Sequence, residues 1–190
     1  MRVLDNNFSL SATDLASFLG CRHRTGLDMA HALGKRRRPH FDDPLLELLI
    51  ERGKKHEKRY VDSLRAAGRE VVDLTAVGDD QVVVTRTVGA MVQGADVIYQ
   101  AGLRTGRWLG KPDILRRIEV PSDLGTWSYE VEDTKLSRET RAGTILQLGL
   151  YSEILAEIQG ISPEQFHVVT PDPESEGRRR THTYRFDDYG

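Results

Sequence analysis

The sequence predicts a mixed α/β domain in which helices flank a central mixed sheet. Segments with helical spacing of apolar residues lie near both ends of the chain, and short runs of alternating or β-branched residues lie between them. Of the 190 residues, 38% are hydrophobic and 29% are charged, which is typical of a globular protein with one core. We therefore expect a single domain over residues 1–190.

The N-terminal part, residues 1–67, is expected to be helical. Ser11 is typical of an N-cap, Asp14 follows it at the capping-box position, and Gly20 is expected to end this first helix. The basic stretch 22–41 has no clear periodicity, so it is predicted to be a loop with at most one helical turn.

A second, longer helix is expected to begin at Asp43 as N-cap, with Pro44 in the first helical position, and to end near Ala67. Its residues at spacings of three and four form one apolar stripe that is expected to face the core. This stripe consists of Leu45, Leu49, Gly53, His56, Tyr60 and Leu64.

The remaining part, residues 68–190, is expected to form the sheet and one long helix. The predicted strands are 71–74, 81–84, 95–103, 107–119, 126–136, 166–169 and 182–186. On the strand 95–103, Val97, Tyr99 and Ala101 are expected to share a face. A helical turn or two is expected over 85–93, turns at Gly106 and over 121–125, and an amphipathic helix over 137–159.

The formal net charge is −2, so the total charge does not indicate nucleic-acid binding. Local basic clusters are more informative, because such patches can contact phosphates. The clusters are Lys35–Arg38, then Arg52, Lys54, Lys55, Lys58 and Arg59, and finally Arg178–Arg180. On charge alone, solvated loops and helix faces are the favoured interpretation.

No apolar run approaches the length of about 20 residues that a membrane helix needs, and the N-terminus lacks the apolar core of a signal peptide. The single cysteine, Cys21, excludes an internal disulfide and any multi-cysteine metal site within this chain. We therefore expect a cytoplasmic protein with no membrane partner, associated with the nucleoid if it acts on DNA.

Asp133 and Lys135 lie two apart on a predicted strand, so their side chains point to the same face. A carboxylate can hold a hard cation, and an ammonium can orient or activate a water molecule or stabilise charge on a phosphate. For this pair alone, a salt bridge on a half-exposed strand is the favoured interpretation. Glu130 and Glu132 would face the opposite side of the strand and rank lower.

Asp113 lies on the preceding predicted strand, one hairpin away from Asp133. Antiparallel neighbours can place these two carboxylates together, and bound Mg²⁺ or Mn²⁺ would relieve their repulsion. An aspartate in a turn after Pro112 is the alternative interpretation.

His56 lies on the apolar stripe of its helix, one turn after Gly53, which leaves room for close approach. A lone inward histidine is more often a hydrogen-bonded core residue than a ligand, although imidazole suits Mn²⁺ better than Mg²⁺. Gln147 and Tyr151 share a face of the last helix and are interpreted either as an exposed flank or as a pair that reaches the substrate or Lys135.

These residues form an ordered series that resembles the RecB-like branch of the PD-(D/E)xK nucleases. The series is Gly53 with His56, Gly110-x-x-Asp113, Asp133-x-Lys135 and Gln147-x-x-x-Tyr151. Within that branch the chain is most similar to RecB-like nucleases that occur alone or fused to a superfamily 1 helicase, and CRISPR-associated RecB-like nucleases are more distant. The resemblance covers about residues 9–189.

The resemblance implies a restriction-endonuclease-like core and a nuclease that acts on DNA and depends on Mg²⁺ or Mn²⁺. The expected substrate is a single-stranded DNA end. The expected partner is a helicase domain or subunit in DNA repair or processing. It implies that His56, Asp113, Asp133 and the carbonyl of Thr134 bind the metal. Lys135 would be the catalytic lysine. The supporting residues would be Gln147 and Tyr151.

Many proteins of this branch carry an iron–sulfur cluster, and Cys21 matches the first of its four cysteines. The other three are absent, so a cluster is expected only in a longer parent protein that is truncated here at its C-terminus. A buried structural cysteine is the alternative. The alternative function is a non-catalytic DNA-binding or scaffolding module of a helicase or CRISPR-adaptation assembly. Hydrolysis of another phosphoester is less favoured.

Overall fold

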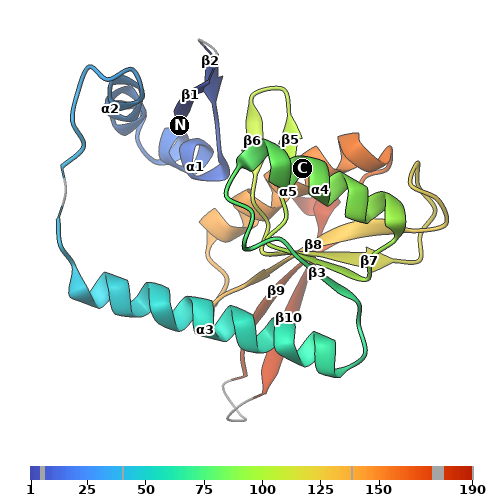
Figure 1. Ribbon diagram of the computed structural model, residues 1–190. Coiled ribbons are helices and arrows are strands. Elements are labelled where there is room, and N and C mark those ends of the chain that lie inside the picture. The colour runs from blue at the N-terminus through green and yellow to red at the C-terminus, as the bar shows by residue number, and fades with distance from the viewer. Residues whose placement is uncertain (5–6, 40, 138, 173–177, 190) are drawn as a thin grey trace.

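The computed structural model describes residues 1–4, 7–39, 41–137, 139–172 and 178–189. A six-stranded mixed sheet lies at its centre, with helices against both faces (Figure 1), which confirms the predicted mixed α/β class. The elements are β1 (Arg2–Leu4), β2 (Asn7–Ser9), α1 (Ala12–Gly20), α2 (Arg22–Ala32), α3 (Pro44–Ala66), β3 (Val71–Asp73), α4 (Asp80–Gln93), β4 (Val97–Tyr99), β5 (Leu103–Thr105), β6 (Trp108–Gly110), β7 (Ile114–Ile118), β8 (Ser128–Thr134), α5 (Ala142–Gln159), β9 (Gln165–Pro171), β10 (Arg179–Arg185) and the 3₁₀ helix η1 (Phe186–Asp188).

The strand order in the central sheet is β10-β9-β8-β7-β4-β3. Strand β8 pairs antiparallel with β7 and parallel with β9, and β4 pairs antiparallel with β7 and parallel with β3. The predicted strands 166–169 and 182–186 correspond to β9 and β10, which pair antiparallel. Because β8 lies inside the sheet and is buried along its whole length, residues at its end are held on both sides.

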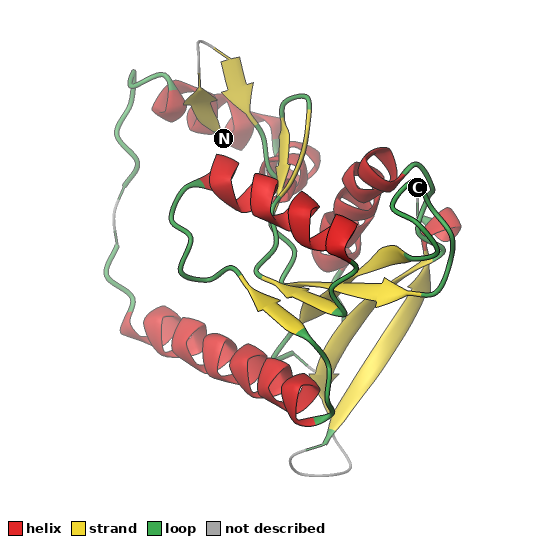
Figure 2. Cartoon of the chain, turned by 45° about the vertical axis from the view of Figure 1, so that its right-hand side comes forward, coloured by secondary structure: helices red, strands yellow, loops and turns green. Residues whose placement is uncertain are grey.

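The two faces of the sheet are covered by different helices (Figures 1 and 2). Leu115 and Val131 belong to the larger apolar cluster, which includes residues of α4 and α5. Ile114 and Val97 point the other way and pack with Val61 of α3. Neighbouring residues of a strand face opposite sides, so the strand sequence itself separates the two layers.

Helix α1 has the expected start, since the Ser11 amide and hydroxyl donate to the Asp14 carboxylate at 2.9 and 2.7 Å. The prediction of a loop over residues 22–41 is wrong, because α2 occupies Arg22–Ala32. None of its residues is buried, so the helix lacks the core-facing stripe that makes helices visible in a sequence. The connection after α2 is fastened by an ion pair between Arg38 and Asp28 at 2.6 Å.

Helix α3 begins as predicted, with the Asp43 carboxylate accepting hydrogen bonds from two backbone amides of the first turn. The predicted core-facing stripe is wrong for its first half, where Leu45 and Leu49 are 65% and 48% exposed. The reason is that this half extends past the sheet (Figure 1). Only the second half, with Val61 fully buried, packs on the strands.

The predicted strand 81–84 is wrong, because these residues form the first turn of α4. The Asp79 carboxylate caps this helix by accepting the Val82 amide at 2.9 Å. Four residues at helical spacing, Val83, Thr87, Ala90 and Met91, are buried. Short runs of β-branched residues fit either element in a sequence, and here the cap and the packing favour the helix.

The predicted strands 95–103 and 107–119 are each broken in two. Strand β4 ends before Gln100, whose φ of 55° turns the chain out of the sheet, so Ala101 joins the opposite core cluster from Val97 and Tyr99. The expected common face therefore does not hold for Ala101.

Strands β5 and β6 form a separate two-stranded sheet, and the predicted turn at Gly106 between them is confirmed. The predicted helix 137–159 begins only at Ala142, with Arg141 as its N-cap, and ahead of it the Ser137 hydroxyl donates to the Glu139 carbonyl at 2.8 Å. Across the described ranges, no helix is both long and apolar enough to span a membrane.

Candidate metal and phosphodiester site

Asp113 and Asp133 lie side by side where β7 begins and β8 ends. The register pairs Ile114 with Glu132, so the residue before β7 falls opposite Asp133 and on the same face. The backbone amide of Thr134 donates to the Asp113 carboxylate at 3.0 Å, and its hydroxyl does so at 3.3 Å. The structure thus brings the two predicted acids together and holds Asp113 in place through the backbone of β8.

The carboxylate of Asp133 is completely buried, and its polar partners are the ammonium of Lys135, with which it forms an ion pair, and the carboxyl group of Asp113. Burial, followed by the charge of Asp113, raises the pKa of Asp133 to about 8, against the opposing charge of Lys135. A buried carboxylate with so few partners is costly, and a cation beside it would remove that cost.

Lys135 directly follows β8, and its amide continues the strand pairing by donating to the Val169 carbonyl at 2.9 Å. Burial lowers the pKa of its ammonium, but the charges of Asp133 and Asp113 outweigh burial, so the pKa is raised overall. The side chain is one-third exposed. The Lys135 ammonium is therefore held by the Asp133 carboxylate and remains partly accessible to solvent.

Gln147 and Tyr151 reach the same site from α5. The Gln147 amide donates to the Tyr151 hydroxyl at 3.2 Å, and that hydroxyl also accepts the backbone amide of Lys111. Burial raises the pKa of Tyr151, and the charges of Asp133 and Asp113 add to this shift. Tyr151 is thus a buried side chain of the long helix that lies within electrostatic reach of the acids.

Gly110 allows this close approach. A Cβ atom at Gly110 would lie 2.9 Å from Cδ1 of Tyr151. We expect Gly110→Ala to destabilise the fold by about 1–2 kcal/mol, because the buried ring has no free space to move into. Denaturant unfolding measures the effect. Gly53→Ala is the matched control: a Cβ there meets nothing within 4 Å, so stability is expected to rise by up to about 1 kcal/mol. An equal change in the free energy of unfolding for the two variants would contradict close packing of Gly110 against the Tyr151 ring.

His56 does not share this environment. Burial, and then the positive charges of Arg179 and Arg59, lower its pKa, and its Nε2 atom is buried without a hydrogen-bond partner. The close approach expected at Gly53 is not found. Tyr60, one turn later on the same stripe, contacts Glu132 on the other face of the sheet. His56 is therefore placed among cations, and the structure does not bring it to the acids.

Glu57 is the residue at this site that the sequence interpretation missed. Its carboxylate accepts hydrogen bonds from the side chains of Gln100 and Tyr99. Burial, and then the charge of Asp113, raises its pKa, while the positive charge of Lys135 opposes the rise. The only signal in the sequence was its position next to His56, because a glutamate on a helix crowded with charges looks like a solvated residue.

Glu130 and Glu132 face the opposite side of β8 from Asp133, as expected, and are buried there under α3. Arg116 lies 3.3 Å from Glu130 and 3.9 Å from Glu132. His167 lies 2.8 Å from both Glu130 and Arg116. This network lies on the other face of β8 from Asp133, and the Nε atom of Arg116 in it is buried without a hydrogen-bond partner.

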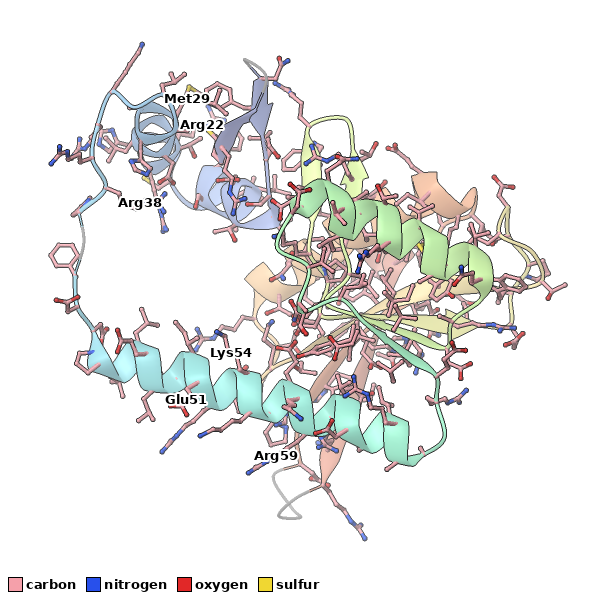
Figure 3. All side chains as sticks on the ribbon, viewed as in Figure 1. Arg22, Met29, Arg38, Glu51, Lys54 and Arg59 are labelled. Carbon is pink, nitrogen blue, oxygen red and sulfur yellow. The ribbon has the colours of Figure 1, made fainter. Side chains whose placement is uncertain are left out.

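A cleft of about 540 Å³ connects the N-terminal helices with the site. Its lining includes Lys111 and Tyr151 at the site and Arg24 and Arg38 beside α2. The basic residues along α3 are exposed instead, as Figure 3 shows for Lys54 and Arg59. Of the three predicted basic clusters, the first thus contributes to this cleft through Arg38.

Cys21 is a free, exposed thiol between α1 and α2, so the alternative of a buried structural cysteine is wrong. In the part of the chain that the structure describes, no three His, Cys, Asp or Glu side chains lie close enough together to hold a metal ion. Asp113 and Asp133 nevertheless suit a hard cation in their chemistry, because two carboxylates lie next to each other and that of Asp133 is fully buried. No model of a known protein family matches the chain, and no curated protein matches it.

Proposed function

We propose that this chain is a divalent-metal-dependent nuclease that hydrolyses phosphodiester bonds in DNA. The observation that carries the proposal is the buried Asp133 carboxylate, which lies beside a second acid and the Lys135 ammonium at the end of a central strand. Such a group costs free energy in a metal-free fold, so its presence calls for a use. The ordered resemblance to RecB-like PD-(D/E)xK nucleases supports the same conclusion.

Asp113 and Asp133 would hold Mg²⁺ or Mn²⁺ through their carboxylate oxygens. When bound, the metal polarises the phosphate and lowers the pKa of a coordinated water. Lys135 would orient the attacking water and stabilise negative charge on the phosphate. Tyr151, fixed by Gln147, would keep the lysine and acids in position, since its hydroxyl lies within their electrostatic reach. The roles of His56 and of the Thr134 carbonyl as ligands stay predictions.

The cleft beside the site supports a polyanionic substrate. Arg24, Arg38 and Lys111 line it and can bind phosphates through charge, in exchange for the ion pairs that Arg38 and Lys111 form with Asp28 and Asp80. The resemblance favours single-stranded DNA ends as the substrate and a helicase domain or subunit as the partner, in DNA repair or processing. Binding by these side chains is expected to weaken as the salt concentration rises.

The test is a cleavage assay on single- and double-stranded DNA with Mg²⁺, with Mn²⁺ and with a chelator. We expect cleavage with either metal and none with the chelator. Lys135→Ala is expected to lower the rate about a hundredfold or more, because it removes charge stabilisation and the orientation of water. Lys58→Ala, on the exposed side of α3, is the control and should cleave normally.

Cleavage that survives the chelator or the Lys135→Ala substitution would reject the proposed mechanism. An unmodified chain that binds DNA without cutting it in either metal would support the non-catalytic DNA-binding or scaffolding module instead.

A further inference from the structure

The first half of α3 carries an exposed apolar patch. The patch consists of large aliphatic side chains that are each between 43% and 65% exposed, namely Leu45, Leu46, Leu48, Leu49 and Ile50. Figures 1 and 2 show this half of the helix extending away from the sheet and from α1 and α2. Single exposed apolar side chains are common on proteins, but a run of them within two helical turns forms a continuous surface of the kind that marks an interaction site.

The patch continues the stripe by which α3 packs on the sheet. In the second half of the helix, Tyr60 and Leu64 lie on this stripe and pack with the buried Val61. Leu45 and Leu49 belong to the same stripe, because its residues recur every three or four positions. A helix with such a stripe normally buries it along its whole length. The first half of α3 therefore has the surface of a packed helix, although its side chains are exposed among the described residues.

Charged residues of opposite sign lie on either side of the patch. Its midpoint falls between Glu47 and Leu48, and Asp43 precedes this midpoint by as many positions as Arg52 follows it. Glu47 lies two positions from both Leu45 and Leu49, so it projects from the opposite side of the helix. The patch can therefore be covered without burying an unpaired glutamate, which would be costly.

We propose that the first half of α3 pairs antiparallel with the same segment of a second copy of this chain, forming a symmetric dimer. When the two patches face each other in this way, Asp43 of each copy lies beside Arg52 of the other. A parallel pair would set Asp43 against Asp43 and Arg52 against Arg52. Flanking charges select the orientation of paired helices, and a two-fold axis requires a surface that is complementary to itself. The patch and its two flanking charges meet this requirement.

The dimer is independent of the proposed nuclease function. The patch and its flanking charges lie in the first half of α3, whereas Asp113, Asp133 and Lys135 lie at the ends of β7 and β8. Substitutions in the patch therefore test the dimer without altering a residue of the proposed site.

The test is sedimentation of the full chain at several concentrations, which measures the mass of the particle. We expect the mass of two chains at high concentration. Leu49→Lys is expected to weaken dimerisation by at least about tenfold, because it places an unpaired charge in the apolar contact. Val92→Lys, at an exposed apolar position on α4, is the matched control and should dimerise normally. Both positions are exposed in the single chain, and circular dichroism checks that each variant is folded.

A charge reversal tests the orientation of the two helices. Arg52→Glu is expected to weaken the dimer by about threefold or more at low salt, because it sets a glutamate beside Asp43. In a parallel pair the same substitution would exchange one like-charge contact for another and change little. Lys54→Glu is the control, since Lys54 follows Leu49 by five positions and projects away from the patch. Its effect should be less than about twofold.

A single-chain mass at every concentration would overturn the inference and leave the patch to a different partner. Dimerisation of Leu49→Lys that matches the unmodified chain would overturn it as well, because the dimer would then form elsewhere. Equal effects of Arg52→Glu and Lys54→Glu would reject the antiparallel pairing.

Discussion

Without a divalent metal, Asp133→Asn is expected to be more stable than the unmodified protein at pH 8 by roughly 2–5 kcal/mol. The upper figure corresponds to a rise of about four pKa units, and loss of the ion pair with Lys135 offsets part of it. Burial, followed by the charge of Asp113, raises the pKa of Asp133 from its ordinary 3.8 to about 8 in the folded state. Between these values the folded protein holds a proton that the unfolded chain has released. This group therefore lowers stability progressively as the pH rises from about 4 to about 8.

The same substitution is expected to lower DNA cleavage by about a thousandfold or more, because it removes a metal ligand that is worth several kcal/mol in the transition state. Thermal unfolding in chelator at pH 4, 6 and 8 measures the first effect. The gain of the variant over the unmodified protein should be small at pH 4 and largest at pH 8. Asp187→Asn, at an exposed position, is the control and should show no gain.

If the stability of Asp133→Asn and of the unmodified protein changes with pH in the same way, the pKa of Asp133 is not raised by burial. If Asp133→Asn gains stability but still cleaves DNA, the burial of Asp133 is confirmed and its role as a metal ligand is rejected.

Arg116→Met is expected to destabilise the protein by about 2–3 kcal/mol. The substitution keeps an unbranched side chain but removes the cation beside Glu130 and Glu132, which are 4% and 1% exposed. Glu132 would then lose its arginine partner, and Glu130 would keep only its contact with His167. This loss of stability is smaller than the roughly 3–5 kcal/mol typical of breaking a fully buried ion pair. The reason is that the Arg116 side chain is itself 40% exposed and partly screened by water.

Urea unfolding at neutral pH measures this loss. Arg180→Met, at an exposed position on β10, is the control and should lie within about 0.5 kcal/mol of the unmodified protein. Adding Glu130→Gln to Arg116→Met should recover part of the loss, since one unpaired charge is removed. A loss below about 0.5 kcal/mol for Arg116→Met would show that solvent, rather than this arginine, neutralises the network.

Several helix boundaries could be read from the sequence because their causes are local. Asp43 and Pro44 predicted the start of α3, and the Asp43 carboxylate caps it. Residues 81–84 could not be assigned correctly from the sequence. Whether a short run of β-branched residues forms a strand or a helix depends on tertiary packing, and here that packing favours the helix. Helix α2 was missed for a related reason, since it buries none of its residues.

The adjacency of Asp113, Asp133 and Lys135 was determined by the sequence itself. A short hairpin brings the two strands together, and the two-residue period of a strand puts Asp133 and Lys135 on one face. Both facts depend on neighbours along the chain. The structure added the complete burial of Asp133, which follows from the layers above and below β8.

Which residue of α3 comes within electrostatic reach of Asp113 was decided only by the tertiary structure, which places Glu57 there. His56 and Glu57 are neighbours on one helix, and a rotation of that helix by one residue would exchange them. The rotation is set by Val61 packing against Val97 and Ile114, which are distant in the sequence. A helical period fixes which residues share a stripe, but the contacts with the sheet fix where that stripe points.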